Sequence, residues 1–216
     1  MDELKLAELL CSRLCHDLVS PVGAVNNGIE LMEEFGEGGG DGEALKLIAS
    51  SGKQAARRLQ FYRVAFGQAG TQLAPPLADV RELLDGIFEG GKLKVEWDPG
   101  SAAPAIPGWG KLLCNLVSLA SEALPRGGTL RVAAAAAGDG AGDGARLSVA
   151  AHGQGCRLND EVRHALEPGV GAEQLSPRGV QPFFTARLAE RMGGKLEVAG
   201  PEGERMTFAV ALPAAG

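Results

Sequence analysis

The chain has 216 residues, of which 45% are apolar and 22% charged, with a formal net charge of −6. These proportions are ordinary for a globular protein and allow one large domain or two small ones. Acids exceed bases by three in residues 1–70 and by three in the rest, so nucleic-acid binding is not expected. No apolar run approaches the roughly 20 residues that span a bilayer, and no signal-peptide core is found near the start, so we expect a cytoplasmic protein without a membrane partner.

The first predicted element is a long amphipathic helix over residues 6–35. Its apolar side chains share one stripe at helical spacing: Leu14, Leu18, Val22, Val25, Ile29 and Met32. His16 lies nearly opposite that stripe, among residues that are small or polar and leave room for a partner: Ser12, Ser20, Gly23 and Asn27. A histidine on such a face has no packing role, which makes it a candidate reactive residue.

Four cysteines, Cys11, Cys15, Cys114 and Cys156, form no CxxC pair. We interpret them as small reduced hydrophobic residues, the first two on or beside the apolar side of the first helix. A metal site made of Cys11, Cys15 and His16 is an alternative. The histidine points away from the cysteines and a fourth ligand is missing, so no metal site is predicted in this chain.

Glycine-rich residues 36–42 end the first helix, and a second helix is predicted over residues 43–68. Its apolar or small positions alternate three and four apart, as in a coiled-coil seam: Leu45, Ile48, Gly52, Ala55, Leu59, Tyr62 and Phe66. A hairpin of two helices cannot bury all of this surface alone. We therefore expect a second copy to dock and complete a four-helix bundle, which predicts a homodimer.

The second helix is basic, with no acid between Ala44 and Gly70; its charged residues are Lys46, Lys53, Arg57, Arg58 and Arg63. A solvated face is one interpretation. The other is a surface that attracts an acidic partner electrostatically.

Residues 71–76, with two consecutive prolines, are predicted to link this hairpin, residues 1–70, to a second domain over residues 77–216. That domain mixes helical and strand patterns, which indicates an α+β fold. Helices are expected at 77–88, 109–123 and 183–192, and strands at 92–97, 129–135, 145–151, 195–199 and 206–212. The loop at 138–144 is rich in glycine.

Several motifs resemble those of histidine kinases. Residues 16–21, His-Asp-Leu-Val-Ser-Pro, resemble the phosphoacceptor box, and residues 112–120 with 125–130 are similar to the N box and the strand after it. Residues 147–155 are similar to the G1 box, and residues 187–196 with 208–213 to the end of the catalytic domain. The resemblance implies a helical hairpin followed by a degenerate kinase-type α/β sandwich of the Bergerat (GHKL-like) kind.

The nucleotide-binding positions of that family are altered here. The magnesium-ligating asparagine of the N box falls on Leu119, the adenine-reading aspartate of the G1 box on Ala151, and a phosphate-cradling glycine on Gln181. Leucine cannot ligate a hard cation, and alanine cannot accept a hydrogen bond from adenine. Bulky side chains also close the space in which backbone amides wrap phosphate. We therefore expect this chain to bind no ATP or other cofactor.

A chain that keeps the histidine without the nucleotide site resembles the histidine phosphotransferases of alphaproteobacteria. The resemblance implies a phosphorelay in which His16 accepts a phosphoryl group from the receiver domain of a hybrid histidine kinase and passes it to a response regulator. Asp17 would assist His16 in catalysis, and magnesium would belong to the receiver. Neighbours on the histidine face are expected to contact the partner: Ser12, Arg13, Ser20, Gly23 and Asn27.

Other residues around the box allow several interpretations. Pro21 has no backbone N–H and so leaves the carbonyl of Asp17 without its helical donor. We expect a kink just below the histidine; the alternative is that the proline only curves a long helix without a role in function. Ser20 takes a position that orients a hydrolytic water in kinase relatives. His152 and His164 are expected to be structural. The alternative functions are a non-catalytic pseudo-kinase that binds response regulators and, less favoured, an ATP-dependent kinase.

Overall fold

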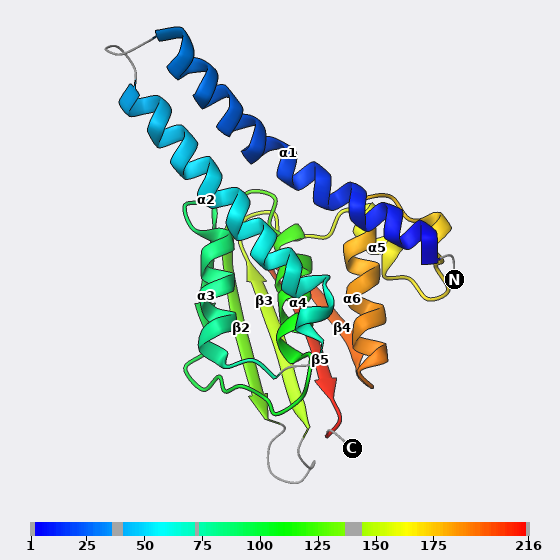
Figure 1. Ribbon diagram of the computed structural model, residues 1–216. Helices are drawn as coiled ribbons and strands as arrows, with labels where there is room; N and C mark the ends of the chain where they lie inside the picture. Colours follow the sequence, from blue (N-terminus) through cyan, green and yellow to red (C-terminus); the bar gives the residue numbers. More distant parts are fainter. Residues whose placement is uncertain (1–2, 36–40, 72–73, 137–143, 215–216) are drawn as a thin grey trace.

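The computed structural model describes residues 3–35, 41–71, 74–136 and 144–214. Both predicted glycine-rich loops lie mostly outside these residues. The N-terminal part is a helical hairpin made of α1 (Glu3–Phe35) and α2 (Asp41–Ala65). Figure 1 shows the two helices side by side and antiparallel, with their connected ends projecting away from the rest of the molecule. The predicted hairpin is confirmed, although α2 ends before residue 68 and a short 3₁₀ turn, η1 (Gln68–Gly70), follows.

The rest of the chain alternates helices and strands as the sequence patterns indicate. The elements in order are α3 (Leu77–Phe88), β1 (Leu93–Trp97), α4 (Trp109–Glu122), β2 (Gly128–Ala136), β3 (Ala145–His152), α5 (Asp160–Ala165), η2 (Ala172–Gln174), α6 (Val180–Arg191), β4 (Lys195–Glu202) and β5 (Arg205–Leu212). Two differences from the sequence prediction stand out. The short helix α5 was not predicted, and α6 begins three residues earlier than expected.

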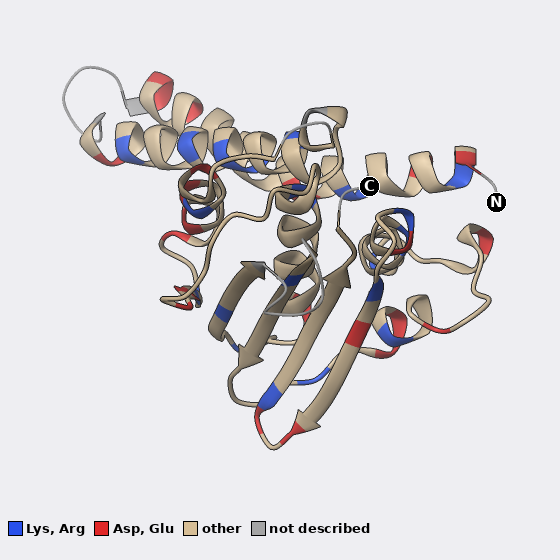
Figure 2. Ribbon diagram, turned by 90° about the horizontal axis from the view of Figure 1, so that it is seen from below, with Lys and Arg blue, Asp and Glu red and all other residues tan. Residues whose placement is uncertain are grey.

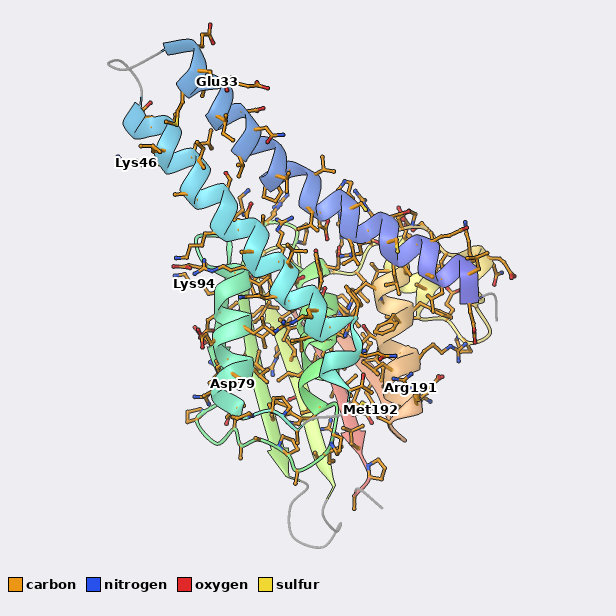
Figure 3. All side chains as sticks on the ribbon, in the orientation of Figure 1. Glu33, Lys46, Asp79, Lys94, Arg191 and Met192 are labelled. Atoms are coloured by element: carbon orange, nitrogen blue, oxygen red, sulfur yellow. The ribbon has the colours of Figure 1, made fainter. Side chains whose placement is uncertain are left out.

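Five strands form one sheet in the order β1-β2-β3-β5-β4. Strands β1 and β2 are parallel, and the other neighbouring pairs are antiparallel. Helices α3, α4 and α6 cover one face of the sheet (Figure 1), and side chains fill the space between the two layers (Figure 3). This arrangement is the two-layer α/β sandwich that the sequence predicts.

The core of the sandwich is built around α4, on which Trp109, Leu112 and Leu116 have no exposed surface. Strand β3 alternates buried and exposed residues, so that Leu147 and Val149 face the helices. Burial of such side chains supplies most of the favourable free energy of folding. The helical layer therefore has a fixed position on the sheet.

The packing continues across the predicted linker. Phe61 and Ala65 of α2 are buried in the same cluster as the sandwich core. At the same end of the hairpin, Leu9 of α1 packs against Val180 and Phe183 of α6. The predicted linker thus joins two parts that share apolar contacts, and the hairpin lies against the sandwich along the N-terminal half of α1 (Figure 1).

Charge and exposure add three observations. Figure 2 shows Lys and Arg along α2, in agreement with its basic composition. All four cysteines are free thiols; Cys114 and Cys156 are buried, whereas Cys11 and Cys15 are exposed in the single chain. Among the described helices none has the length and apolar character needed to cross a membrane.

Candidate functional site

His16 lies near the middle of α1, and its side chain is 88% exposed. Its Nδ1 atom lies 3.2 Å from Oδ1 of Asp17. A carboxylate accepts hydrogen bonds, so this contact places the ring proton on Nδ1 and leaves Nε2 with its lone pair. On so exposed a ring, Nε2 is accessible to a reacting partner.

Asp17 is held through its side chain by two residues. The Tyr62 hydroxyl of α2 donates a hydrogen bond to Oδ2 of Asp17 at 2.5 Å, and Nε of Arg13 lies 4.0 Å from the same oxygen. Burial, followed by the hydrogen bond to Asp17, raises the pKa of Tyr62, so the phenol stays protonated and remains a donor at physiological pH. The carboxylate therefore keeps its other oxygen, Oδ1, for His16.

The backbone of Asp17 has a partner of its own. Pro21 lies four residues further along α1 and has no N–H, so it cannot donate to the Asp17 carbonyl. Arg58 of α2 donates to that carbonyl instead. The sequence predicts the freed carbonyl correctly, and α1 continues through Pro21 as one helix. The predicted kink stays a prediction.

The C-terminal domain reaches the site through Arg13. Nη2 of Arg13 forms an ion pair with Oε1 of Glu122, at the end of α4, at 2.6 Å, and Nη1 donates to the backbone carbonyl of Arg178 at 3.4 Å. Both charged side chains of the ion pair are largely shielded from water, so the contact is worth more than an exposed ion pair. These contacts fix α1 to the sandwich one turn before His16.

A depression of about 520 Å³ opens beside His16 where α1 meets the sandwich. Its lining comes from both parts of the molecule: Ser12, Arg13, His16, Asp17, Glu122, Glu161, Pro177 and Arg178. Side chains of both signs are present, so the depression suits a polar surface that carries both acidic and basic groups.

The residues predicted to contact a partner lie around this depression and further along α1. Ser12, Ser20 and Asn27 are exposed, and the space that a side chain at Gly23 would occupy is open. Arg13 differs from this group because its guanidinium is engaged with Glu122 and the Arg178 carbonyl. It holds the site together and has little freedom to bind a partner.

Tyr62, Arg58 and Glu122 complete the site; the sequence patterns did not mark Tyr62 or Glu122 as functional, and they gave Arg58 only a possible role in attracting an acidic partner. Tyr62 was placed in the apolar seam and Arg58 on the basic face. A tyrosine within a buried seam needs a hydrogen-bond partner, and this was the signal available for Tyr62. Glu122 carries no such signal, because only the fold brings the end of α4 to α1.

Comparisons with known proteins agree with this arrangement. Residues 77–204 match the family described as the histidine phosphotransferase C-terminal domain. Over 199 residues the chain is 36% identical to the protein phosphotransferase ChpT of Brucella abortus, with 92% of this chain and 91% of that protein covered.

The chain belongs to the histidine phosphotransferase family.

Solved structures confirm the fold of the phosphotransferase. One bacterial phosphotransferase is 35% identical, with 97% of each chain covered and a TM-score of 0.81. The histidine kinase AdeS of Acinetobacter baumannii is 14% identical, covers 93% of this chain and 98% of its own, and has a TM-score of 0.52. The second likeness concerns the fold alone: a helical hairpin followed by a kinase-type sandwich.

The positions that differ from the kinase pattern are packed in the phosphotransferase. Leu119 and Ala151 are buried in the core. Gln181 is buried as well, and its Nε2 donates to the backbone carbonyl of Asn115 at 2.8 Å and to Oγ1 of Thr185 at 2.9 Å. Asn115 in turn donates to the Ala65 carbonyl at 2.7 Å. All three positions are thus buried, and the end of α2 lies against Asn115, the hydrogen-bond partner of Gln181.

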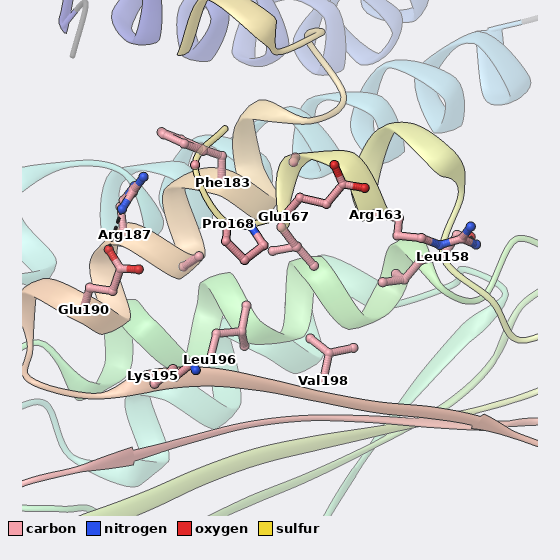
Figure 4. A pocket seen from close by; sticks show the side chains of 14 residues that line it. Leu158, Arg163, Glu167, Pro168, Phe183, Arg187, Glu190, Lys195, Leu196 and Val198 are labelled. Atoms are coloured by element: carbon pink, nitrogen blue, oxygen red, sulfur yellow. Dashed lines mark hydrogen bonds and ion pairs between the residues drawn. The ribbon is translucent and has the colours of Figure 1, made fainter. Parts of the chain in front are cut away.

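Other candidate sites of the phosphotransferase lie elsewhere. A depression of about 620 Å³ lies between α5, α6 and β4, and His16 is not part of its lining. Figure 4 shows its side chains, among them Phe183, Arg187 and Lys195. Within the described ranges no group of three or more His, Cys, Asp or Glu side chains is arranged to hold a metal ion. The other two histidines lie away from His16 in the sequence: His152 is exposed at the end of β3, and Nδ1 of His164 lies 2.9 Å from Oε2 of Glu167.

Proposed function

We propose that His16 is the residue that carries the phosphoryl group in this histidine phosphotransferase. It would accept the group from the aspartate of a receiver domain in a hybrid histidine kinase and pass it to the receiver of a response regulator. This proposal rests mainly on the geometry of His16: its side chain is 88% exposed, its Nδ1 contacts Asp17, and its Nε2 is accessible.

The chemistry needs few protein groups. A neutral imidazole is a nucleophile near neutral pH, and phosphoryl transfer depends mainly on in-line positioning and charge stabilisation. Nε2 attacks the phosphorus of the partner's acyl phosphate while the bond to the aspartate oxygen breaks. The ring gains positive charge as the N–P bond forms, and the Asp17 carboxylate stabilises this charge. The reverse sequence passes the group on to the second receiver.

We infer that this chain supplies neither nucleotide nor metal to the reaction, and that magnesium comes with the receiver domain. Supporting this, Leu119 and Ala151 carry no group that could bind magnesium or adenine, and Gln181 is hydrogen-bonded within the core. The family membership and the exposed histidine favour transfer over the two alternatives, a non-catalytic binding module and an ATP-dependent kinase.

We also propose that the active form is a homodimer built on the hairpin. Apolar side chains of both helices remain exposed in the single chain, among them Val22 (49%), Ile29 (44%), Leu45 (51%) and Leu59 (55%). A second hairpin that covers them would complete a four-helix bundle. The basic face of α2 would then attract the acidic surface of a receiver.

The test is a transfer assay with a receiver domain that carries a radiolabelled phosphoryl group on its aspartate, in the presence of magnesium. We expect label on the wild-type chain and none on His16→Gln. His164→Gln is the matched control, because His164 is also exposed with its Nδ1 beside a carboxylate. Label on His16→Gln, or label from ATP without a donor receiver, would contradict the proposal.

A further inference from the structure

We propose that Tyr62 is a positioning residue for phosphotransfer. Its hydroxyl fixes the Asp17 carboxylate so that the His16 ring keeps its proton on Nδ1 and offers Nε2 as the nucleophile. This inference rests on the proposed role of His16 and adds to it the residue of α2 that selects the reactive ring nitrogen.

The two oxygens of Asp17 have different partners. Oδ2 accepts from the Tyr62 hydroxyl at 2.5 Å and has Arg13 Nε at 4.0 Å, whereas Oδ1 lies 3.2 Å from His16 Nδ1. An aspartate on a helix surface otherwise rotates its carboxylate between several orientations. With Oδ2 occupied by α2, only Oδ1 is left for the imidazole, so the hydrogen bond to Nδ1 has a fixed acceptor.

Tyr62 is itself held rigidly. Its ring packs edge-to-face against Phe61 and is stacked on Phe66, with centroid distances of 5.7 Å in both pairs. Its half-buried position raises the pKa of the phenol, which therefore remains a donor when a carboxylate faces it. The exposed histidine has no comparable packing, so its orientation depends on this chain of two hydrogen bonds.

The arrangement matters most during the transfer step. As the Nε2–P bond forms, the electron pair of the breaking P–O bond leaves with the receiver's aspartate. The imidazole becomes a cation that still carries its proton on Nδ1, pointing at Oδ1 of Asp17. A carboxylate fixed in advance stabilises this cation more than the neutral ring, and interactions that strengthen toward the transition state accelerate the reaction.

The first test is ¹⁵N NMR of the histidine rings in the full chain, with Tyr62→Phe as the variant. Phenylalanine keeps the ring contacts and removes only the hydroxyl. We expect the Nδ1–H tautomer of His16 in the wild type and a mixture of both tautomers in Tyr62→Phe. His164 is an internal reference, because its Nδ1 faces Glu167 far from Tyr62 in the sequence and its signals should not change. An unchanged His16 tautomer in Tyr62→Phe would overturn the inference.

The second test is the single-turnover rate of transfer from a phosphorylated receiver domain. Only part of the worth of this hydrogen bond reaches the reacting ring, because Tyr62 acts through Asp17, which predicts a rate about five- to tenfold lower for Tyr62→Phe. In an Asp17→Asn background the same substitution should change the rate less than twofold, because Tyr62 acts through Asp17. An equal loss in both backgrounds would show that Tyr62 acts through packing and would overturn the inference.

Two controls separate the possible failures. Phe66→Leu disturbs the stack on Tyr62 but keeps the hydroxyl, so the His16 tautomer should stay as in the wild type. If His16→Gln still accepts the phosphoryl group, the proposed function fails. If His16→Gln is inactive and Tyr62→Phe transfers at the wild-type rate, only the role of Tyr62 fails.

Discussion

At the scale of single residues, Asp17 is the point where the hairpin supports the histidine that we propose as the phosphoryl carrier. Its side chain accepts from Tyr62 and its backbone carbonyl from Arg58, both on α2. The residue next to His16 is thus anchored twice. Because of these anchors, the histidine can remain exposed for a partner and still have a defined orientation.

Arg58 is expected to compensate for the proline in α1. Removing its guanidinium in Arg58→Ala leaves the half-buried Asp17 carbonyl without a donor, which should lower the free energy of unfolding by about 1.5–3 kcal/mol. In a Pro21→Ala background the backbone N–H of residue 21 supplies the missing donor. There the same substitution should cost less than about 1 kcal/mol. Urea unfolding of the wild type, both single variants and the double variant, all at the same protein concentration, measures the cost of Arg58→Ala in each background. Equal costs in the two backgrounds would contradict this compensation.

Residue roles around Asp17 could be predicted only in part from the sequence. The freed carbonyl follows from Pro21 alone, because a proline lacks the backbone N–H that would donate to the carbonyl four residues before it in a helix. The partners Arg58 and Tyr62 do not follow, since the register between two helices is set by packing over their whole length. Tyr62 has the spacing of a seam residue and Arg58 that of a solvated face, and both patterns are compatible with a purely structural role.

At the scale of elements, a side chain of α4 donates hydrogen bonds to backbone carbonyls just after the end of α2. Nζ of Lys111 donates to the backbone carbonyls of Gly67 at 2.8 Å and Phe66 at 3.3 Å, and it lies over the ring of Phe184. The last carbonyls of a helix have no partner within the helix, and a cation there also interacts favourably with the helix dipole. Lys111 therefore stabilises the junction between hairpin and sandwich.

Lys111→Met is expected to lower the free energy of unfolding by about 1–3 kcal/mol, because the carbonyls at the end of α2 lose their donor. The difference in the free energy of unfolding between the wild type and Lys111→Met should also depend on pH. Burial, followed by the charge of Arg191, lowers the pKa of Lys111 below its ordinary value of 10.5. Between these two pKa values the unfolded chain binds more protons, so the wild type gains stability relative to the variant as pH rises.

Urea unfolding of the wild type and Lys111→Met at about pH 8 and about pH 10 measures this trend. Other groups whose pKa differs between the folded and unfolded chain are present in both proteins, so their contributions cancel in the difference between wild type and variant. If the difference in the free energy of unfolding between the two proteins becomes smaller as the pH rises, the expectation is contradicted.

Element positions were predicted well wherever a pattern is long enough to show its period. Helices α1 and α3 and the antiparallel strands follow from spacing alone. The helix α5 spans only six residues, Asp160–Ala165, which is less than two turns and too short for a repeating apolar face. The sequence pattern placed the start of α6 at residue 183, whereas the helix begins at Val180 and carries Pro182 in its first turn, a position that proline fits.

At the scale of the whole molecule, the exposed apolar residues of the hairpin predict the oligomeric state. We expect wild-type protein to elute with twice the mass of one chain in size-exclusion chromatography with light scattering. Leu59→Glu and Ile29→Glu should shift it to the monomer, because each places a charge in the proposed bundle. Val198→Glu is the matched control: Val198 is an exposed apolar residue of β4, and its substitution should leave the dimer intact. A monomeric wild type would contradict the dimer.

The ion pair between Arg13 and Glu122 has a consequence for how transfer can proceed. It joins the turn of α1 just before His16 to the end of α4, and the apolar contacts of Leu9 and Phe61 with the sandwich lie on either side of it. A hinge motion between hairpin and sandwich would have to break all three contacts at once. A receiver domain that docks as proposed beside His16 would therefore meet a surface on which hairpin and sandwich are already joined.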